Sequence, residues 1–406
     1  MFSLLQKSLF AATGTLLLVG LMIPSALAQK KYGPGASDSE ILIGQTMPYS
    51  GPASAYGTIG KVQAAYFNMI NEQGGVNGRK IKLISLDDGY SAPRTVEQVR
   101  RLVEHDKVLL LFQTLGTASN SAIHKYVNGK QVPHLFVASG ASKWADPKNY
   151  PWTIGFNLSY QVEGQIYAGY ILKNKPNAKI GVLYQNDDYG KDVLSGFKSR
   201  LGDQAGKMIV SEVSYEVTDP TIDSQIVSLK GSGADTFINI STPKFAAQAI
   251  RKAYDTNWKP LHFLNNVSQS IGSVLTPAGL EKSVGLITTS YYKDPSDLQW
   301  KNDAGMKDWL SFMKKYYPEG SLNDATNVYG YLAAQLLVHV LKQCGDDLSR
   351  ENVMAQVANL KDVSLPLLLP GIKLNTSPSD FVLFEQLRLA RFDGKEWVLI
   401  GELIGR

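Results

Sequence analysis

Residues 108–119, VLLLFQTLGTAS, decide the fold prediction. The first five of them form an uninterrupted apolar run, which is typical of a strand buried on both faces of a parallel sheet. A glycine-containing loop follows, and a helix is expected from there to about Lys130. Because a parallel sheet is built from strands that alternate with helices, we expect the same unit to recur on both sides of this stretch.

The same alternation of strand and helix extends from residue 40 onward. Helical spacing of apolar residues, or a proline at a first helical turn, marks a helix after most of the strands. Two such series predict an α/β fold of two doubly wound lobes, each a parallel sheet with helices on both faces. The expected strands are 41–43, 81–84, 108–112 and 135–137 in the first series, and 180–184, 208–213, 236–240 and 261–264 in the second, which begins near Tyr160.

The last hundred residues break the alternation. A long helix is expected over 327–343, and a hairpin is expected to join strands 387–392 and 397–400 through the turn Asp393-Gly394. No low-complexity linker separates the two series, so we expect short connections that act as a hinge.

The chain begins with the parts of a secretory signal peptide. Lys7 is followed by an uncharged run, 9–23, and then by Ala26-Leu27-Ala28. A membrane anchor is the alternative, but a spanning helix needs roughly 20 apolar residues. We therefore expect residues 1–28 to be removed. The next residue is Gln29 and not a cysteine that could carry a lipid, so we expect a soluble protein held in a Gram-negative periplasm.

Charge and cysteine content argue against other classes of protein. Lys and Arg number 41 and Asp and Glu 36, and removal of Lys7 with the signal peptide lowers the net charge from +5 to +4. The basic residues are scattered, so nucleic acid is not expected as a partner. Cys344 is the only cysteine, so we expect no internal disulfide and no cysteine-based metal cluster.

Motifs of common enzymes are absent from the sequence. The five histidines lack metal-ligand spacing, and there is no His-Glu-x-x-His, G-x-S-x-G, Walker A or dinucleotide-binding glycine motif. A match to S-x-x-K at 241–244 contains a proline that fits a helix start better. We therefore expect a binding protein without cofactor or metal, and regard an α/β enzyme as the less favoured class.

Loops at the carboxyl ends of parallel strands bind ligands in open α/β sheets. The loop around Gly116 is the strongest candidate, because glycine lets backbone N–H groups approach a ligand and the following helix directs its positive end to the same place. This arrangement suits a carboxylate, whereas the alternative is that Thr117 or Ser119 merely caps the helix. Tyr56 and Tyr189, one in each series, stand beside glycines and either clamp a ligand or serve as packing residues.

Several of these loops resemble the periplasmic binding proteins of branched-chain amino-acid ABC transporters. Their order and spacing make the match, which covers essentially the whole mature chain. The matching segments are Ser50-Gly51-Pro52, Tyr56-Gly57, 70–79 (INEQGGVNGR), Asp87-Asp88, 186–190 (NDDYG) and Gly279-Leu280-Glu281.

The resemblance implies a type I periplasmic-binding fold with three crossovers between its lobes. Lobe one would comprise 39–157 and 290–380, and lobe two 158–289 and 381–406. The lobes would close by a hinge on a small molecule and present it to the membrane permease of an ABC transporter, with the binding protein itself a monomer. A sensory receptor uses the same fold and remains an alternative.

The resemblance also implies a ligand site. Backbone N–H groups near Gly116 would hold a carboxylate with Ser142 nearby, the Gly140 carbonyl would receive an ammonium, and an aromatic ring from each lobe would flank the ligand. The implied contact residues are Tyr56, Leu115, Gly116, Thr117, Gly140, Ser142, Tyr189, Asn266 and Val267.

The chain departs from the family pattern at Val267. In leucine-binding members an acidic residue at this position holds the ammonium of the ligand, and a buried ammonium without a partner would be costly. Asp187 or Asp188 could supply the charge from another loop. Without that charge, an aliphatic or aromatic carboxylate or a short amide rivals a branched-chain or related amino acid as the ligand.

Overall fold

A computed structural model describes residues 30–405 of the chain. The expected signal peptide, 1–28, lies outside the described residues. Within 30–405, no helix has the length and apolar character needed to cross a membrane.

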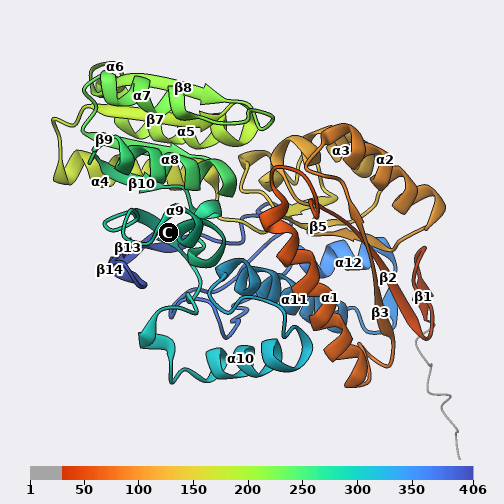
Figure 1. Cartoon of the computed structure of the whole chain (residues 1–406). Coiled ribbons are helices and arrows are strands. Elements are labelled where there is room, and N and C mark those ends of the chain that lie inside the picture. The colour runs from red at the N-terminus through yellow and green to blue at the C-terminus, as the bar shows by residue number, and fades with distance from the viewer. Residues whose placement is uncertain (1–29, 406) are drawn as a thin grey trace, which may run out of the picture.

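The N-terminal part of the chain builds a parallel sheet of five strands in the order β3-β2-β4-β5-β6. We call this sheet and the helices packed around it lobe one. Helix α11 lies beside α1, although some 270 residues separate them in sequence (Figure 1). The elements of lobe one are β2 (Glu40–Met47), α1 (Gly57–Glu72), β3 (Lys80–Asp87), α2 (Ala92–Arg100), β4 (Leu110–Phe112), α3 (Thr117–Gly129), β5 (His134–Val137), β6 (Thr153–Gly155), α10 (Ala304–Tyr316), α11 (Ala325–Gln343) and α12 (Arg350–Val357), with the short pair β1 (Lys31–Tyr32) and β12 (Asp347–Leu348).

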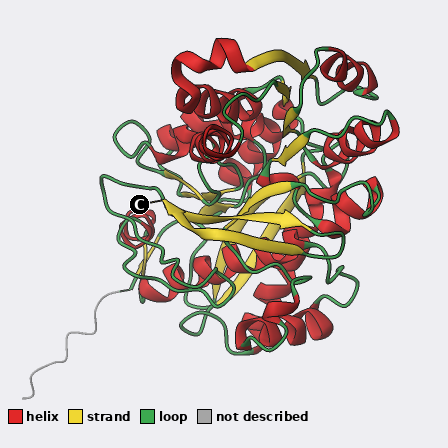
Figure 2. Cartoon of the chain, turned by 90° about the vertical axis from the view of Figure 1, so that its left-hand side faces the viewer, coloured by secondary structure: helices red, strands yellow, loops and turns green. Residues whose placement is uncertain are grey.

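A second sheet, of seven strands in the order β14-β13-β11-β10-β9-β7-β8, forms lobe two. Five of its strands are parallel, and the predicted C-terminal hairpin adds two antiparallel strands at one edge. Figure 2 shows strands at the centre of the molecule with helices around them. The elements of lobe two are α4 (Tyr160–Asn174), β7 (Ile180–Gln185), α5 (Asp188–Leu201), α6 (Ala205–Met208), β8 (Ile209–Tyr215), α7 (Asp223–Gly231), β9 (Thr236–Ile240), α8 (Pro243–Asp255), β10 (Leu261–Leu264), α9 (Thr276–Ala278), β11 (Ile287–Ser290), β13 (Gln386–Phe392) and β14 (Trp397–Gly405).

The chain passes between the two sheets three times. It crosses from β6 to α4, from β11 to α10, and from α12 to β13. The arrangement confirms the predicted fold of two doubly wound α/β lobes with three crossovers.

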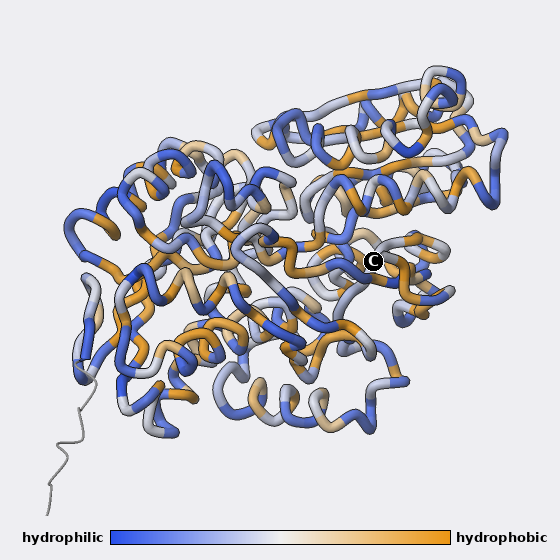
Figure 3. The backbone as a smooth tube through the Cα atoms, turned by 180° about the vertical axis from the view of Figure 1, so that it is seen from behind, coloured by the Kyte–Doolittle hydropathy of each residue, from blue (hydrophilic) through white to orange (hydrophobic). Residues whose placement is uncertain are grey.

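The central strands form because their side chains are apolar on both faces. All five residues of 108–112 are fully buried, although only the last three pair as β4, so the strand is shorter than its apolar run predicted. Burying each large apolar side chain stabilises the fold by about 1.5–3 kcal/mol. In Figure 3, hydrophobic segments run through the interior and hydrophilic ones lie mostly along the rim.

Candidate ligand-binding site

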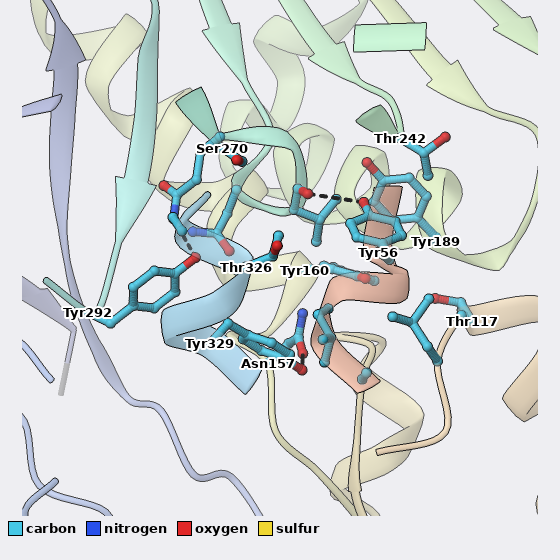
Figure 4. A pocket seen from close by; sticks show the side chains of 18 of the residues that line it. Tyr56, Thr117, Asn157, Tyr160, Tyr189, Thr242, Ser270, Tyr292, Thr326 and Tyr329 are labelled. Carbon is cyan, nitrogen blue, oxygen red and sulfur yellow. Dashed lines mark hydrogen bonds between the residues drawn. The ribbon is translucent and has the colours of Figure 1, made fainter. Parts of the chain in front are cut away.

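One cavity lies between the lobes, at the carboxyl ends of strands from both sheets. It encloses about 620 Å³ that protein atoms do not fill, part of which is open to solvent. Figure 4 shows its labelled side chains arranged around a common space, with Thr117 at one end and Tyr292 at the other. The lining residues are Tyr56, Ile59, Tyr90, Leu115, Gly116, Thr117, Ala138, Asn157, Tyr160, Tyr189, Thr242, Asn266, Val267, Gln269, Ser270, Tyr291, Tyr292, Ala325, Thr326 and Tyr329.

The lining is uncharged and rich in tyrosine. Within the part of the chain that the structure describes, it contains no Asp, Glu, Lys, Arg or His. Burial raises the pKa of Tyr56, Tyr90 and Tyr189 well above the usual value of a phenol. Their hydroxyls therefore stay protonated, and the cavity offers aromatic surface together with neutral donors and acceptors.

The N-terminus of α3 opens onto the cavity at Gly116. This residue is the N-cap, with a φ of 102° that favours glycine, and an added Cβ would lie 2.8 Å from the Tyr90 ring. The N–H groups of Thr117, Ala118 and Ser119 have no hydrogen-bond acceptor within residues 30–405. These free donors and the positive end of the helix are of the kind that stabilises an anion.

Capping by a side chain, the alternative role for this loop, is wrong. No side chain caps α3. The Thr117 hydroxyl instead lies 2.7 Å from the Ser139 hydroxyl.

Neither acid that could replace a charge at Val267 lines the cavity. Asp187 is the N-cap of α5, where its carboxylate accepts hydrogen bonds from the backbone N–H groups of Tyr189 and Gly190 at 3.0 and 3.2 Å. Asp188 forms an ion pair with Lys143 at 2.6 Å. Both carboxylates are thus held by protein groups, and neither is part of the cavity lining.

A family model described as "Periplasmic binding protein" matches residues 40–396. The chain belongs to this family. Among its relatives, the Leu/Ile/Val-binding protein homolog 7 of Brucella suis biovar 1 (strain 1330) is 22% identical over 336 residues, which are 80% of this chain and 82% of the relative. The Leu/Ile/Val-binding protein homolog 1 of the same organism is 25% identical over 320 residues, or 77% of this chain and 81% of the relative.

Solved structures show that this periplasmic binding protein has the type I fold. A fatty acid ABC transporter substrate-binding protein from Thermomonospora curvata superposes with a TM-score of 0.78 at 22% identity, over 93% of this chain and 95% of that one. A branched chain amino acid ABC transporter from Thermus thermophilus with bound valine gives a TM-score of 0.81 at 15% identity, over 91% and 98% of the two chains. Because these two neighbours are named for different ligands, the fold alone does not select a ligand.

Most of the residues implied by the family resemblance meet in the cavity. Tyr56, Leu115, Gly116, Thr117, Tyr189, Asn266 and Val267 all line it. Gly140 and Ser142 do not, because lobe two uses their polar groups. The Gly140 carbonyl accepts the Tyr160 N–H at 2.8 Å, and the Ser142 N–H and hydroxyl donate to Asp192 at 2.8 and 3.1 Å.

Sequence reasoning missed the carboxylate of Glu163, which is buried behind the cavity wall. It accepts hydrogen bonds from Tyr167 (2.6 Å), the Asn266 backbone N–H (2.7 Å), Thr289 (3.0 Å) and the Asn265 side chain. Burial is the main cause that raises its pKa to about 7. The sequence offered one clue to this acid. Glu163 lies three residues after Tyr160 and four before Tyr167, on an otherwise apolar face of the helix.

Five lining tyrosines were also missed: Tyr90, Tyr160, Tyr291, Tyr292 and Tyr329. The pair 291–292 follows β11 directly, so the rule that ligands meet the carboxyl ends of strands could have found it. Tyr329 comes from the first turns of α11, and no local pattern marks its position.

Proposed function

We propose that this periplasmic binding protein is the solute-capturing component of an ABC importer, as the names of its relatives and structural neighbours suggest. The mature chain, after loss of residues 1–28, works in the periplasm as a monomer and presents its ligand to a membrane permease. Two lobes close on the ligand. The first comprises 39–157 and 290–380, and the second comprises 158–289 and 381–406. The three crossovers between the sheets support a hinge of this kind.

We further propose that the ligand is a small carboxylate or amide with an aliphatic or aromatic body and no ammonium group. The observation that carries this proposal is the absence of any charged side chain from the cavity lining among residues 30–405. A branched-chain amino acid, the ligand class that the family resemblance implies, would bury its ammonium without a carboxylate partner, which is costly.

A single carboxylate has a suitable place at the N-terminus of α3. The free N–H groups from Thr117 onward and the helix dipole stabilise a negative charge there. The body of the ligand would lie against tyrosine rings such as those of Tyr160 and Tyr189, whose centroids are 5.0 Å apart. Aromatic faces favour flat or apolar groups.

Calorimetry with matched ligand pairs tests this proposal. The probes are L-leucine against 4-methylpentanoate, L-phenylalanine against 3-phenylpropanoate, and the primary amides of the two acids, each titrated into the chain that begins at Gln29. We expect the member without an amino group to bind at least about tenfold more tightly, a difference of about 1.4 kcal/mol. Tighter binding of either amino acid would contradict the proposed ligand class.

A further inference from the structure

A chain of hydrogen-bonded side chains crosses lobe one and ends at the cavity. Gln45 Nε2 donates to Gln63 Oε1 at 2.6 Å, and Gln63 Nε2 donates to Gln113 Oε1 at 3.2 Å. Gln113 Nε2 then donates to the Tyr329 hydroxyl at 3.3 Å, which donates to Asn157 Oδ1 at 2.6 Å. The three glutamine side chains are fully buried, so no water competes for these bonds.

Backbone carbonyls determine the direction of this chain. Gln113 Nε2 faces the Phe136 carbonyl oxygen, and Gln45 Nε2 faces that of Phe112 at 3.4 Å. A carbonyl oxygen only accepts, so the amide nitrogen of each glutamine must point to it. Gln113 therefore turns its oxygen to Gln63, which has to donate, and the oxygen of Gln63 is left to accept from Gln45.

This direction determines which atom Asn157 presents to the cavity. Since the Tyr329 oxygen accepts from Gln113, the Tyr329 proton is directed to Asn157, and the amide oxygen of Asn157 must receive it. The Asn157 Nδ2 group then remains, and it has no protein partner within residues 30–405. Asn157 lines the cavity, and Figure 4 shows its amide nitrogen on the side away from the Tyr329 hydroxyl.

Reversing the Asn157 amide would place its NH₂ group against the Tyr329 proton. The buried chain would then lose its last acceptor, and a buried donor without a partner is costly. Because burial also keeps the pKa of Tyr329 well above its usual value, the hydroxyl stays protonated at neutral pH and remains a donor. The orientation of Asn157 is thus built into lobe one.

We propose that Asn157 is a specificity-determining residue, which donates a hydrogen bond from Nδ2 to an oxygen atom of the ligand. Gln45, Gln63, Gln113 and Tyr329 are positioning residues that make it a donor and not an acceptor. Asn157 lies between β6 and α4, on a crossover between the lobes, so it meets the ligand at the hinge. The inference rests on the proposed function, since it concerns the same cavity.

Neutron diffraction from crystals of the ligand-free mature chain in D₂O tests the orientation without a ligand. We expect the Tyr329 deuterium to point at Asn157 Oδ1, and both deuterium atoms of Asn157 Nδ2 to lie on the cavity side. An Asn157 oxygen facing the cavity, or a Tyr329 deuterium pointing elsewhere, would overturn the proposal.

Substitution of Asn157 tests its role in specificity. Asn157→Asp keeps the shape of the side chain and its bond from Tyr329, but presents a charged acceptor to the cavity. We expect the affinity for 4-methylpentanoate and 3-phenylpropanoate to fall at least about 100-fold. The affinity for their primary amides should fall less, because an amide can turn its own NH₂ group to the new carboxylate. A purely structural role would weaken acids and amides alike, and that result would overturn the proposal.

Tyr329→Phe provides a second variant that leaves the ring and its packing in place. Without the hydroxyl, Asn157 is free to turn, and we expect affinity for the acids to fall about three- to tenfold. Asn174→Asp and Tyr126→Phe, which make the same chemical changes far from the cavity, are the matched controls and should bind as the wild type does.

Unchanged affinity in both the Asn157 and Tyr329 variants would exclude the proposed donor. If the wild type binds none of the probes, the proposed ligand class fails, and the neutron map still decides the orientation of Asn157.

Discussion

The Tyr56 hydroxyl of lobe one donates a hydrogen bond to the backbone carbonyl of Val267 in lobe two, at 3.0 Å. Both residues line the cavity, so the lobes meet directly at its wall. The Ser270 hydroxyl makes a second contact across the lobes, to Asp324 at 2.7 Å. These two hydrogen bonds between protein groups join the lobes at the cavity.

Removing the Tyr56 hydroxyl should favour the open form. Tyr56→Phe keeps the ring but loses one hydrogen bond between the lobes, worth about 1 kcal/mol. We expect about fivefold weaker binding of 3-phenylpropanoate by calorimetry, and a larger radius of gyration of the ligand-free chain by small-angle scattering. Tyr254→Phe, on the exposed surface, is the control. If Tyr56→Phe matches that control in both measurements, the contact does not support closure.

A side chain at Gly116 should block binding with a limited effect on folding. Gly116→Val places a Cβ 2.8 Å from the Tyr90 ring and strains a backbone with φ of 102°, at a cost of about 1–3 kcal/mol in unfolding free energy. We expect loss of measurable binding with a cooperative thermal transition retained. Gly231→Val is the control, because a Cβ there meets nothing within 4 Å. Normal binding by a folded Gly116→Val protein would show that this loop does not contact the ligand.

The pH dependence of stability should carry a contribution from Glu163. Burial raises its pKa from 4.5 to about 7, so the folded state favours the protonated carboxyl. The resulting stabilisation is complete below about pH 4.5 and is lost as pH rises through 7; it amounts to a few kcal/mol at most.

Urea unfolding of the wild type and of Glu163→Gln across this pH range measures that contribution. We expect the wild type to lose stability relative to the variant between pH 4.5 and pH 7.5, because glutamine does not titrate. A difference between the two proteins that stays constant, or changes in the opposite direction, would show that Glu163 is not buried as a raised-pKa acid.

Loss of Asp188 should change binding very little. Its ion pair with Lys143 is about half exposed, and such pairs contribute about 0–1 kcal/mol. We expect Asp188→Asn to weaken the binding of L-leucine and of 4-methylpentanoate by less than about threefold in calorimetry. A selective loss of more than tenfold for leucine would mean that Asp188 reaches the ammonium of an amino acid, and would argue against the proposed ligand class.

The strands and helices around the site could be predicted because their causes are local. The buried run before Gly116 and the turn at Asp393-Gly394 carry their conformations in a few neighbouring residues. Gly140 and Ser142 show the limit of such reasoning, since they lie on a loop of the expected kind. Their polar groups are used by Tyr160 and Asp192, contacts that depend on how the second lobe packs against the first.

The sequence by itself determined the two-lobed α/β fold and the helix that begins after Gly116, because hydrophobic periodicity and backbone freedom are properties of single segments. Only the tertiary structure decided that the cavity is uncharged and that Asn157 presents its amide nitrogen. Tyr329 approaches Asn157 from a helix more than 150 residues further along the chain. The Phe136 carbonyl orients the Gln113 amide, which donates to the Tyr329 hydroxyl and so directs the Tyr329 proton to Asn157. The direction of a hydrogen bond depends on what lies at both of its ends, and packing alone brings those ends together.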